Sequence, residues 1–579
     1  MSETSPLGIR IPHRELPPPG LPVRVRELRQ WLDEVPLVSG GRAGQMLLKQ
    51  LSRLNRVEIA PLTRLALLDL LLTPVDTAVG FLCRRFMDTT LPLSDKARVG
   101  ASLALKLYAE LATGYKVCAH ELGMGHPGMS ERKALVVALF KAVRRTAFTL
   151  RLAALVYRPY PTHLWRDLHA LYVFAVGNKW TDVGVRFLQD DRTRRGTIGG
   201  EYLCMLAFSM ANPYHLRQLE QQQVQRLLEG LEVLPHIRSA TPYSPGPTRF
   251  VISFDKDLPP RPSLVVGRPS PPAAILDTAP LVAWLKEAWD LFSTDLGSVQ
   301  PMKEGPGITR GTAERLAASW GRAGERRYER TELHFDLKLA VGFAAVHQAM
   351  SRDDPHYDGD FALRGIEVVD LGGDSALSLE GDSGLSLVPT DEQDSIFLTP
   401  ADVSFGPSSW MSEEPPPRIW DERPKRSVPQ SQILRQRTVN EGAGGYCVRW
   451  EGNEVPELGV GYLVGIQATT ATSRWAVGVI RWLCNPPGEG IETGIQLISV
   501  NPVGAEVKDE TSPRPVQKPA ILIPELKSGR RPESLILPLS HFREGQHLTL
   551  LQGREGRAIR LGRRLEATGT FVQFTYSLL

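Results

Sequence analysis

The stretch that decides the fold of the second half of this chain lies between Leu434 and Val507. It contains LRQRTVNEGAGGYCVRW from residue 434, LGVGYLVGIQ from 458, RWAVGVIRWLC from 474 and ETGIQLISV from 492. Each segment alternates apolar and polar residues and is rich in Val, Ile, Trp and Tyr, which is typical of half-buried β-strands. Gly, Asn and Pro separate the segments, as in Gly452-Asn453 and Asn485-Pro486-Pro487-Gly488. The pattern predicts a small antiparallel barrel or sandwich with short turns.

A glycine-rich turn follows the first of these strands. It reads Asn440-Glu441-Gly442-Ala443-Gly444-Gly445. Glycines let a backbone turn sharply, and they also let a ligand approach the main chain closely. The turn is therefore either a plain hairpin connection or part of a binding site.

These residues resemble the PilZ domain, the bacterial receptor module for cyclic di-GMP. The family pattern is R-x-x-x-R, a strand, D-x-S-x-x-G, and then strands that contain V-G-x-V and G-I-x-F. Here Asn440-x-Gly442-x-x-Gly445 stands in place of D-x-S-x-x-G, with Asn for Asp and Gly for Ser. The later strands are matched by Val477-Gly478-Val479-Ile480 and Thr493-Gly494-Ile495-Gln496-Leu497.

The arginine motif of the family is matched by Arg326-x-x-x-Arg330, which lies about 110 residues before Asn440 instead of the usual few tens. Arginine suits a ligand with two phosphates and two guanines, because guanidinium binds phosphate bidentately and stacks on or hydrogen-bonds to guanine. By resemblance, Arg326 and Arg330 would contact the phosphates and guanine, and Asn440 would face a guanine edge. Gly442 and Gly445 would let backbone amides approach the ligand.

The arginine spacing is a weak signal by itself. The same R-x-x-x-R spacing occurs at Arg322/Arg326 and at Arg560/Arg564. Arg326–Arg330 could therefore be a solvated charge run, and the turn at Asn440 a hairpin connection with no ligand.

Length and composition indicate an ordinary globular protein of several domains. The chain has 579 residues, of which 42% are hydrophobic and 23% charged, so we expect two to four domains. Its net charge of +4 is too small to indicate nucleic-acid binding. A basic cluster at Arg554, Arg557, Arg560, Arg563 and Arg564 lacks interleaved aromatic residues, so nucleic acid is not an expected partner.

Cysteine usage and hydropathy predict a cytoplasmic protein. Five scattered cysteines without a C-x-x-C pair favour free thiols in a reducing compartment. The N-terminus does not resemble a secretory signal. Apolar runs are interrupted by Asp69 or Lys141 before they reach the length of a membrane span, so we expect none.

Changes in composition and hydrophobic periodicity divide the chain into seven segments. We expect an extended Pro-rich arm over 1–21, a helical interaction domain over 22–235 and an α+β connecting region over 236–321. Residues 322–350 hold the arginine motif and the first strand of a split PilZ-like domain. Residues 351–432, with 17 acidic and 3 basic residues from Arg352 to Glu422, predict a disordered acidic insert. The PilZ-like barrel would then cover 433–513, and a further β unit 514–579.

The helical domain allows two interpretations. Trp165-x-x-Leu168-x-x-x-Tyr172 matches the first half of a tetratricopeptide signature, but Thr181 stands where a small alanine is expected. An irregular helical interaction domain is the better interpretation. Arg144 and Arg145 interrupt a long apolar helix, which predicts that this helix has a solvated face.

Nothing in the chain predicts catalysis, a metal or a cofactor. His120 and His126 are six residues apart with glycines between them, which does not fit a zinc-binding helix. Gly459-Val460-Gly461 lies in a strand pattern with no helix after it, so it is not a dinucleotide fingerprint. No Ser/His/Asp grouping or Walker loop is present. We expect no enzyme, no catalytic residues and no metal site.

The sequence therefore predicts a multidomain protein with an all-α N-terminal domain, a C-terminal all-β PilZ-like barrel and an additional β unit. By resemblance, it would be a cyclic di-GMP receptor that couples ligand binding to contacts between the helical domain and an unidentified protein partner. Its outputs would be motility, attachment or exopolysaccharide control. The alternative is a scaffold or adaptor that acts through its helical domain and whose barrel no longer binds nucleotide.

Overall fold

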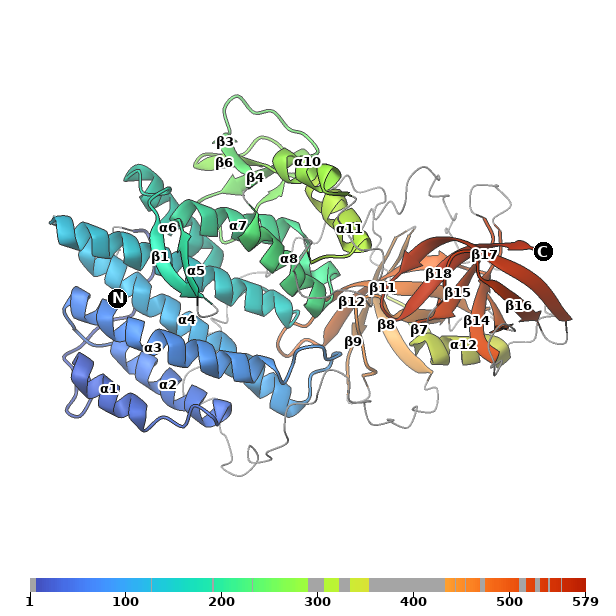
Figure 1. The fold of residues 1–579 in the computed structure, drawn as a ribbon, viewed down its shortest axis with the longest axis horizontal. Helices are drawn as coiled ribbons and strands as arrows, with labels where there is room; N and C mark the ends of the chain where they lie inside the picture. Colours follow the sequence, from blue (N-terminus) through green and yellow to red (C-terminus); the bar gives the residue numbers. More distant parts are fainter. Residues whose placement is uncertain are drawn as a thin grey trace.

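The protein is elongated, with helices at one end and two β-barrels at the other (Figure 1). This computed structural model describes residues 7–125, 128–189, 192–231, 233–289, 307–321, 334–352, 433–442, 444–452, 455–468, 474–509, 517–525, 532–539, 542–552 and 555–579. A small sheet lies on the helical part. The acidic insert expected over 351–432 falls almost entirely outside the described residues.

The helical part contains eight α-helices within the described residues. Their apolar periodicity drives them to pack around two long central helices, α4 and α5. Ser94 caps α4 by accepting a hydrogen bond from the Ala97 amide, and Pro61 stands in the first turn of α3, where no amide donor is needed. The helices are α1 (Val25–Asp33), α2 (Gly40–Asn55), α3 (Pro61–Cys83), α4 (Asp95–Gly123), α5 (Met129–Leu155), α6 (Leu164–Gly177), α7 (Ile198–Met210) and α8 (Gln218–Gly230), with the short 3-10 helix η1 (Pro213–His215) before α8.

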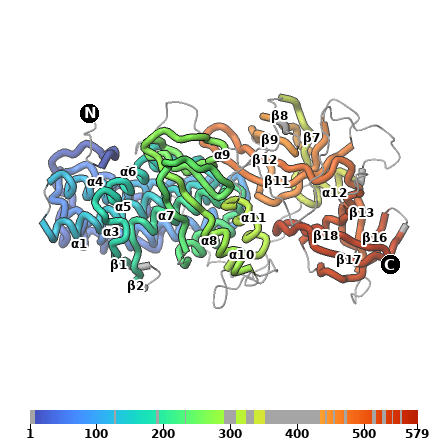
Figure 2. The backbone as a smooth tube through the Cα atoms, turned by 90° about the horizontal axis from the view of Figure 1, so that it is seen from above, coloured from blue at the N-terminus to red at the C-terminus, as the bar shows by residue number. Residues whose placement is uncertain are grey.

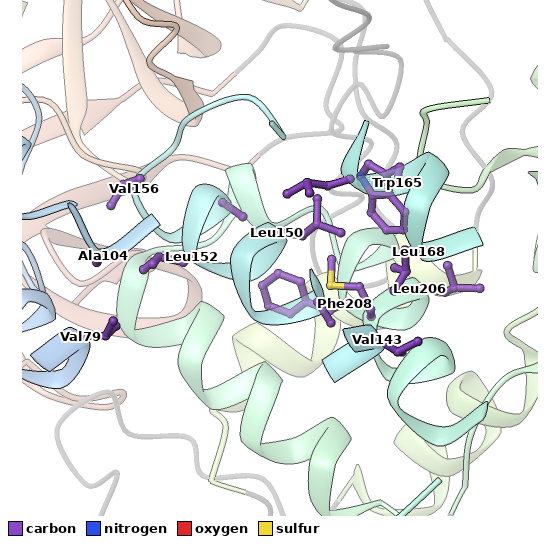
Figure 3. Close-up of a cluster of buried hydrophobic side chains, with 14 of the residues drawn as sticks. Val79, Ala104, Val143, Leu150, Leu152, Val156, Trp165, Leu168, Leu206 and Phe208 are labelled. Carbon is purple, nitrogen blue, oxygen red and sulfur yellow. The ribbon is translucent and has the colours of Figure 1, made fainter. Parts of the chain in front are cut away.

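The core of the helical part forms where α5, α6 and α7 meet. Figure 3 shows Leu150, Trp165 and Phe208 in one cluster of side chains, and all three are buried. Trp165, which suggested a tetratricopeptide repeat, is therefore a core residue. Residues 7–21 form no helix and lie along this part, with Leu7 and Ile9 buried in the same core.

Two details of the helical part differ from the sequence expectations. Arg144 and Arg145 are buried instead of solvated, because Glu201 and Asp76 from neighbouring helices pair with their guanidinium groups. A hairpin of β1 (Val185–Gln189) and β2 (Arg192–Gly196) also interrupts the helices. The apolar–polar alternation of these two strands is too short to be recognised between helices.

Helix α3 is, among the described residues, the one helix long and apolar enough to cross a membrane by length and composition. It contacts α2 and α4 extensively. Arg64 of α3 is buried, with its Nε 3.0 Å from Glu121 Oε2 of α4. These contacts make α3 a core helix of the helical part.

A four-stranded sheet packs against the helices. It contains β3 (His236–Ser239), β6 (Ala273–Asp277), β4 (Arg249–Ser253) and β5 (Arg261–Pro262) in that order. Nearby are α9 (Ser263–Val266), α10 (Ala279–Glu287) and α11 (Arg310–Gly321). Buried side chains of β4 and β6 belong to the helical core cluster, and the Trp320 indole donates to the Ala207 carbonyl at 3.0 Å. The region expected to connect two domains is therefore an attached layer of the helical part.

The first barrel contains β7 to β12. Its closed order is β10-β11-β12-β9-β8-β7, and every neighbouring pair is antiparallel. β7 precedes the long segment after residue 352 yet pairs with both β8 and β10. The strands are β7 (Asp336–Val341), β8 (Leu434–Gly442), β9 (Gly445–Trp450), β10 (Leu463–Ala468), β11 (Ala476–Cys484) and β12 (Ile491–Ser499).

The second barrel contains β13 to β18 in the closed order β13-β14-β15-β18-β17-β16. It begins at Val503, so the boundary expected between residues 513 and 514 lies about ten residues too late. β13 follows β12 closely in sequence but pairs with β14 and β16. The strands are β13 (Val503–Lys508), β14 (Gln517–Ile523), β15 (Ser534–Pro538), β16 (His547–Gln552), β17 (Glu555–Ala567) and β18 (Phe571–Leu578).

Helix α12 (Phe343–Arg352) lies between the two barrels, which Figure 2 shows side by side at one end of the molecule. Val346 of α12 packs in one apolar cluster with Val477 and Val479 of the first barrel and Ile521 of the second. The His347 ring donates from Nε2 to the Ala505 carbonyl at 2.9 Å. The barrels therefore share an apolar interface.

Candidate ligand-binding site

The glycine-rich turn joins β8 to β9 at one end of the first barrel. Asn440 lies opposite Cys447, and Gly442 lies opposite Gly445, so the two glycines close the hairpin. A β-bulge separates Thr438 from Asn440. Bulges of this kind redirect a side chain beside a site. The structure thus brings three of the five predicted site residues, Asn440, Gly442 and Gly445, into one turn.

Gly445 is required by the local geometry. Its φ is +156°, and a Cβ at this position would lie 1.9 Å from the Ile495 carbonyl oxygen. The neighbouring Gly444 carbonyl accepts a hydrogen bond from the Leu497 amide at 2.9 Å. The turn therefore rests on the backbone of β12, at a distance that only glycine permits.

The chain enters β7 beside this turn. The Thr438 amide donates to the Phe335 carbonyl, and the Phe335 amide donates to Thr438 Oγ1, both at 3.1 Å. The His334 ring donates from Nδ1 to the Thr438 carbonyl at 3.0 Å. Because β7 and β8 are antiparallel, His334 stands at the Asn440 end of β8. Arg326 and Arg330 themselves lie outside the described residues.

A lateral row crosses the outer face of the barrel from the turn. Asn440, Cys447, Gly494 and Trp482 are paired in register on β8, β9, β12 and β11. The Trp482 indole lies directly on Gly494, where a Cβ would be 1.7 Å from the indole Nε1. Cys447 and Trp482 cluster together with Cys484 and apart from the barrel core. The row therefore places closely packed side chains next to the turn.

Gln496 adds a polar group beside the turn. It lies opposite Gly445 on β12, and its Oε1 accepts a hydrogen bond from Arg481 Nε at 2.6 Å. Sequence reasoning missed Gln496 and Trp482. They stand about 40 to 55 residues after the turn, and the signal they gave was the ordinary alternation of a strand.

Cys484 and Glu492, which lie near the row, are a buried thiol and a paired carboxylate. Burial raises the pKa of Cys484 to about 12, so this thiol stays protonated. Glu492 is hydrogen-bonded to Arg449 at 2.6 Å, and this hydrogen bond raises the pKa of Arg449. No group of three His, Cys, Asp or Glu side chains within the described residues could hold a metal ion. What the geometry offers is hydrogen-bonding and backbone surface for a bound molecule.

The fold and the turn define a protein with a PilZ domain. The middle of the chain, residues 249–363 and 388–502, matches the family model described as "Cyclic-di-GMP receptor FimW, middle PilZ domain". Residues 26–240 match the FimW N-terminal domain, and residues 503–579 match the FimW C-terminal beta-barrel domain. The chain therefore belongs to this three-domain PilZ family, which is a receptor family and not an enzyme family.

The chain is similar along most of its length to one curated relative, the cyclic-di-GMP receptor FimW of Pseudomonas aeruginosa. The two are 27% identical over 559 residues, which is 95% of this chain and 90% of the relative. No solved structure matches the chain. The family boundary between residues 502 and 503 agrees with the start of the second barrel at Val503.

Proposed function

We propose that this protein is a cytoplasmic cyclic di-GMP receptor that converts ligand binding at the first barrel into altered contacts of its helical part with a protein partner. The PilZ family membership and the name of the relative support this function. The five cysteines, all within the described residues, form no disulfide, which suits a reducing compartment. Motility, attachment or exopolysaccharide control would be the outputs.

The observation that carries the proposal is the path of the chain into β7. Thr438 holds His334 and Phe335 at the Asn440 end of β8. Arg330 is four residues before His334 in the sequence, so the arginine motif leads into the strand that stands beside the turn, although about 110 residues separate Arg330 from Asn440 in sequence.

The proposed contacts follow from the chemistry of the ligand. Arg326 and Arg330 would pair with the phosphates and with guanine. Asn440 would accept a hydrogen bond from a guanine edge. Gly442 and Gly445 would let the ligand reach backbone groups. Ligand binding would draw the arginine segment onto the turn. Since this segment begins directly after α11, that movement would be passed to the helical part.

Calorimetric titration of cyclic di-GMP into the full-length protein tests the proposal, with GTP as the control ligand. We expect micromolar binding that is lost in the double variant Arg326→Ala/Arg330→Ala. The matched control is Arg560→Ala/Arg564→Ala, which removes two arginines of the same spacing from the second barrel. Binding that survives the first pair, or disappears with the second, would refute the assigned site.

The alternative function is a scaffold whose first barrel binds no nucleotide. It is favoured by one observation, the presence of Asn440 and Gly442 where the family pattern has Asp and Ser. The same titration decides between the two functions. No heat change up to about a millimolar ligand would support the scaffold, because it limits the binding free energy to about −4 kcal/mol or weaker.

A further inference from the structure

A small cleft of about 60 Å³ opens where the helical part and both barrels meet. Each of the three contributes polar side chains to it, so the cleft is a junction and not a pocket within one domain. Its lining residues are Asn212, His215, Arg217, Glu220, Arg315 and Ser319 from the helical part with its attached layer, Val460, Gly461, Ile480, Arg481 and Gln496 from the first barrel, and Thr568 from the second.

The first barrel brings the turn to this cleft through β12. Gly445 is paired with Gln496, and the Gln496 side chain holds Arg481 by the 2.6 Å hydrogen bond to Nε. Arg481 lies at a register shift between Ile480 and Trp482, so β11 is locally irregular at this residue. One strand pair and one side-chain hydrogen bond thus connect the turn with Arg481.

Arg481 also holds the second barrel. Its guanidinium forms a two-point ion pair with Glu566 of β17, with Nη2 3.1 Å from Oε2. Both side chains are largely buried, at 17% and 9% exposed. A bidentate pair fixes the orientation of its partners as well as their distance. Arg481 is thus shared between an amide beside the turn and a carboxylate of the second barrel.

The segment after Glu566 contacts the helical part. Gly569 has φ +85°, and a Cβ there would lie 1.7 Å from Arg217 Nη1. Arg217 forms an ion pair with Glu220 at 3.0 Å, and Arg315 of α11 pairs with the same carboxylate. Thr570 Oγ1 donates to the Gly461 carbonyl at 2.6 Å, which attaches this segment to the first barrel as well.

We propose that Arg481 couples occupancy of the turn to the junction of the three domains: an anionic ligand at the turn competes with Glu566 for the Arg481 guanidinium. Weakening of the Arg481–Glu566 pair releases the 566–570 segment from Arg217. The helical part then changes its position against the barrels. This regulation rests on the proposed function, since it requires a phosphate-bearing ligand at the turn.

Hydrogen exchange of the full-length protein with and without cyclic di-GMP tests the coupling. We expect ligand to increase exchange at least threefold in amides of 566–570 and of the start of α8. In Glu566→Gln these amides should exchange faster without ligand and lose the ligand response. Calorimetry should show that the variant binds the ligand more tightly than the wild type, because the carboxylate that competes for Arg481 has lost its charge.

The matched control is Glu492→Gln. Glu492 of β12 pairs with Arg449 of β9, and this ion pair lies within the first barrel. This variant should keep the ligand response at 566–570. It also shows whether loss of a buried carboxylate disturbs the barrel in general, and thermal unfolding of both variants controls for global loss of structure.

The outcomes separate the coupling from the proposed function. Binding without an exchange response in the wild type, or an unchanged response in Glu566→Gln, overturns the coupling and leaves the receptor function intact. Absence of calorimetric binding in the wild type overturns both. Loss of the response in Glu492→Gln as well would show a general effect of barrel stability and would also overturn the coupling.

Discussion

The two barrels of this protein have the same strand topology but different sequences around their first strand. When β7–β12 and β13–β18 are each numbered from one to six, both barrels have the closed order 1-2-3-6-5-4, with strand four paired to strand one. Both also have a register shift between strands five and six. Two different sets of side chains therefore form the same closed six-stranded barrel.

The two barrels differ in the sequence that flanks their first strand. In the first barrel, an arginine segment precedes strand one, and α12 with a long segment follows it. In the second barrel, strand one is preceded by Val500-Asn501-Pro502, which contains no arginine. The two barrels thus share a topology but differ in the sequence that leads into strand one, and the proposed site depends on that sequence as well as on the fold.

The cores of the two barrels also differ in their connections. The core of the first barrel is continuous with that of the helical part, because Leu458 and Val460 are buried in the same cluster and Leu458 pairs with Leu91. The core of the second barrel is a separate cluster that includes Phe574. We therefore expect a core change in the first barrel to reach the helices and one in the second barrel to remain local.

Truncation of one core aromatic in each barrel tests this difference and has the largest expected effect. Trp450→Ala and Phe574→Ala should each cost about 3–5 kcal/mol, since both side chains are fully buried. Hydrogen exchange should then increase in both the first barrel and α3–α4 for Trp450→Ala. For Phe574→Ala the increase should be confined to β13–β18. Identical patterns for the two variants would show that the cores are not separate.

Gly445→Ala tests the strained turn and should cost about 3 kcal/mol of local stability. The new Cβ would meet a backbone carbonyl that cannot move without breaking the β9–β12 pairing. Exchange of the β9 and β12 amides should accelerate about 100-fold. Gly556→Ala on β17 is the control, because its Cβ meets only side-chain atoms, at 3.3 Å or more. If Gly445→Ala and Gly556→Ala had equally mild effects, the turn would not require glycine at position 445.

The junction should be sensitive to acid, with an effect of up to about 3 kcal/mol. Burial alone would raise the pKa of Glu220, but the charges of Arg315 and Arg217 lower it from 4.5 to about 2. The carboxylate therefore stabilises the folded state fully above pH 4.5, and this contribution is lost as the pH falls toward 2. Glu220→Gln removes the contribution at every pH.

Exchange rates of the α8 amides measure this effect when both proteins are compared at the same pH. The exchange rate of the α8 amides in Glu220→Gln, divided by the rate in the wild type, should be large at pH 6 and approach one near pH 2. Amides of the second barrel, whose core is apolar, should show no such trend. A ratio independent of pH would mean that Glu220 does not hold the junction as a charged group.

Restoring the family pattern at the turn should have the smallest effect, a gain of about tenfold in affinity. Asn440→Asp adds a charged acceptor and Gly442→Ser adds a hydroxyl, at about 0.5–3 kcal/mol for each new hydrogen bond. Titration of cyclic di-GMP into the double variant measures the gain. Asn501→Asp, which adds the same charge before the second barrel, should leave the affinity unchanged. A weaker affinity in the double variant would mean that the turn binds the ligand differently from the family pattern.

Several features of the fold could be predicted from the sequence because they depend on local pattern. Residues 434–500 alternate with a period of two, and the structure places five strands there that close a barrel with β7. The first strand expected within residues 322–350 is β7, which is followed directly by α12. Helical periodicity identified the helical part. The buried ion pairs of Arg144 and Arg145 could not be predicted, because their partners lie 57 and 69 residues away in sequence.

The sequence by itself determined the two secondary-structure types, the glycine turn at Asn440 and the arginine motif proposed to act with it. Only the tertiary structure decided that β13 belongs to the second barrel, because strand pairing depends on distant partners and not on the alternation within a strand. It also decided that Arg481, an ordinary residue of a strand pattern, lies between Gln496 and Glu566. Periodicity encodes which residues are buried, but the juxtaposition of polar groups from three domains follows only from the packing of the whole chain.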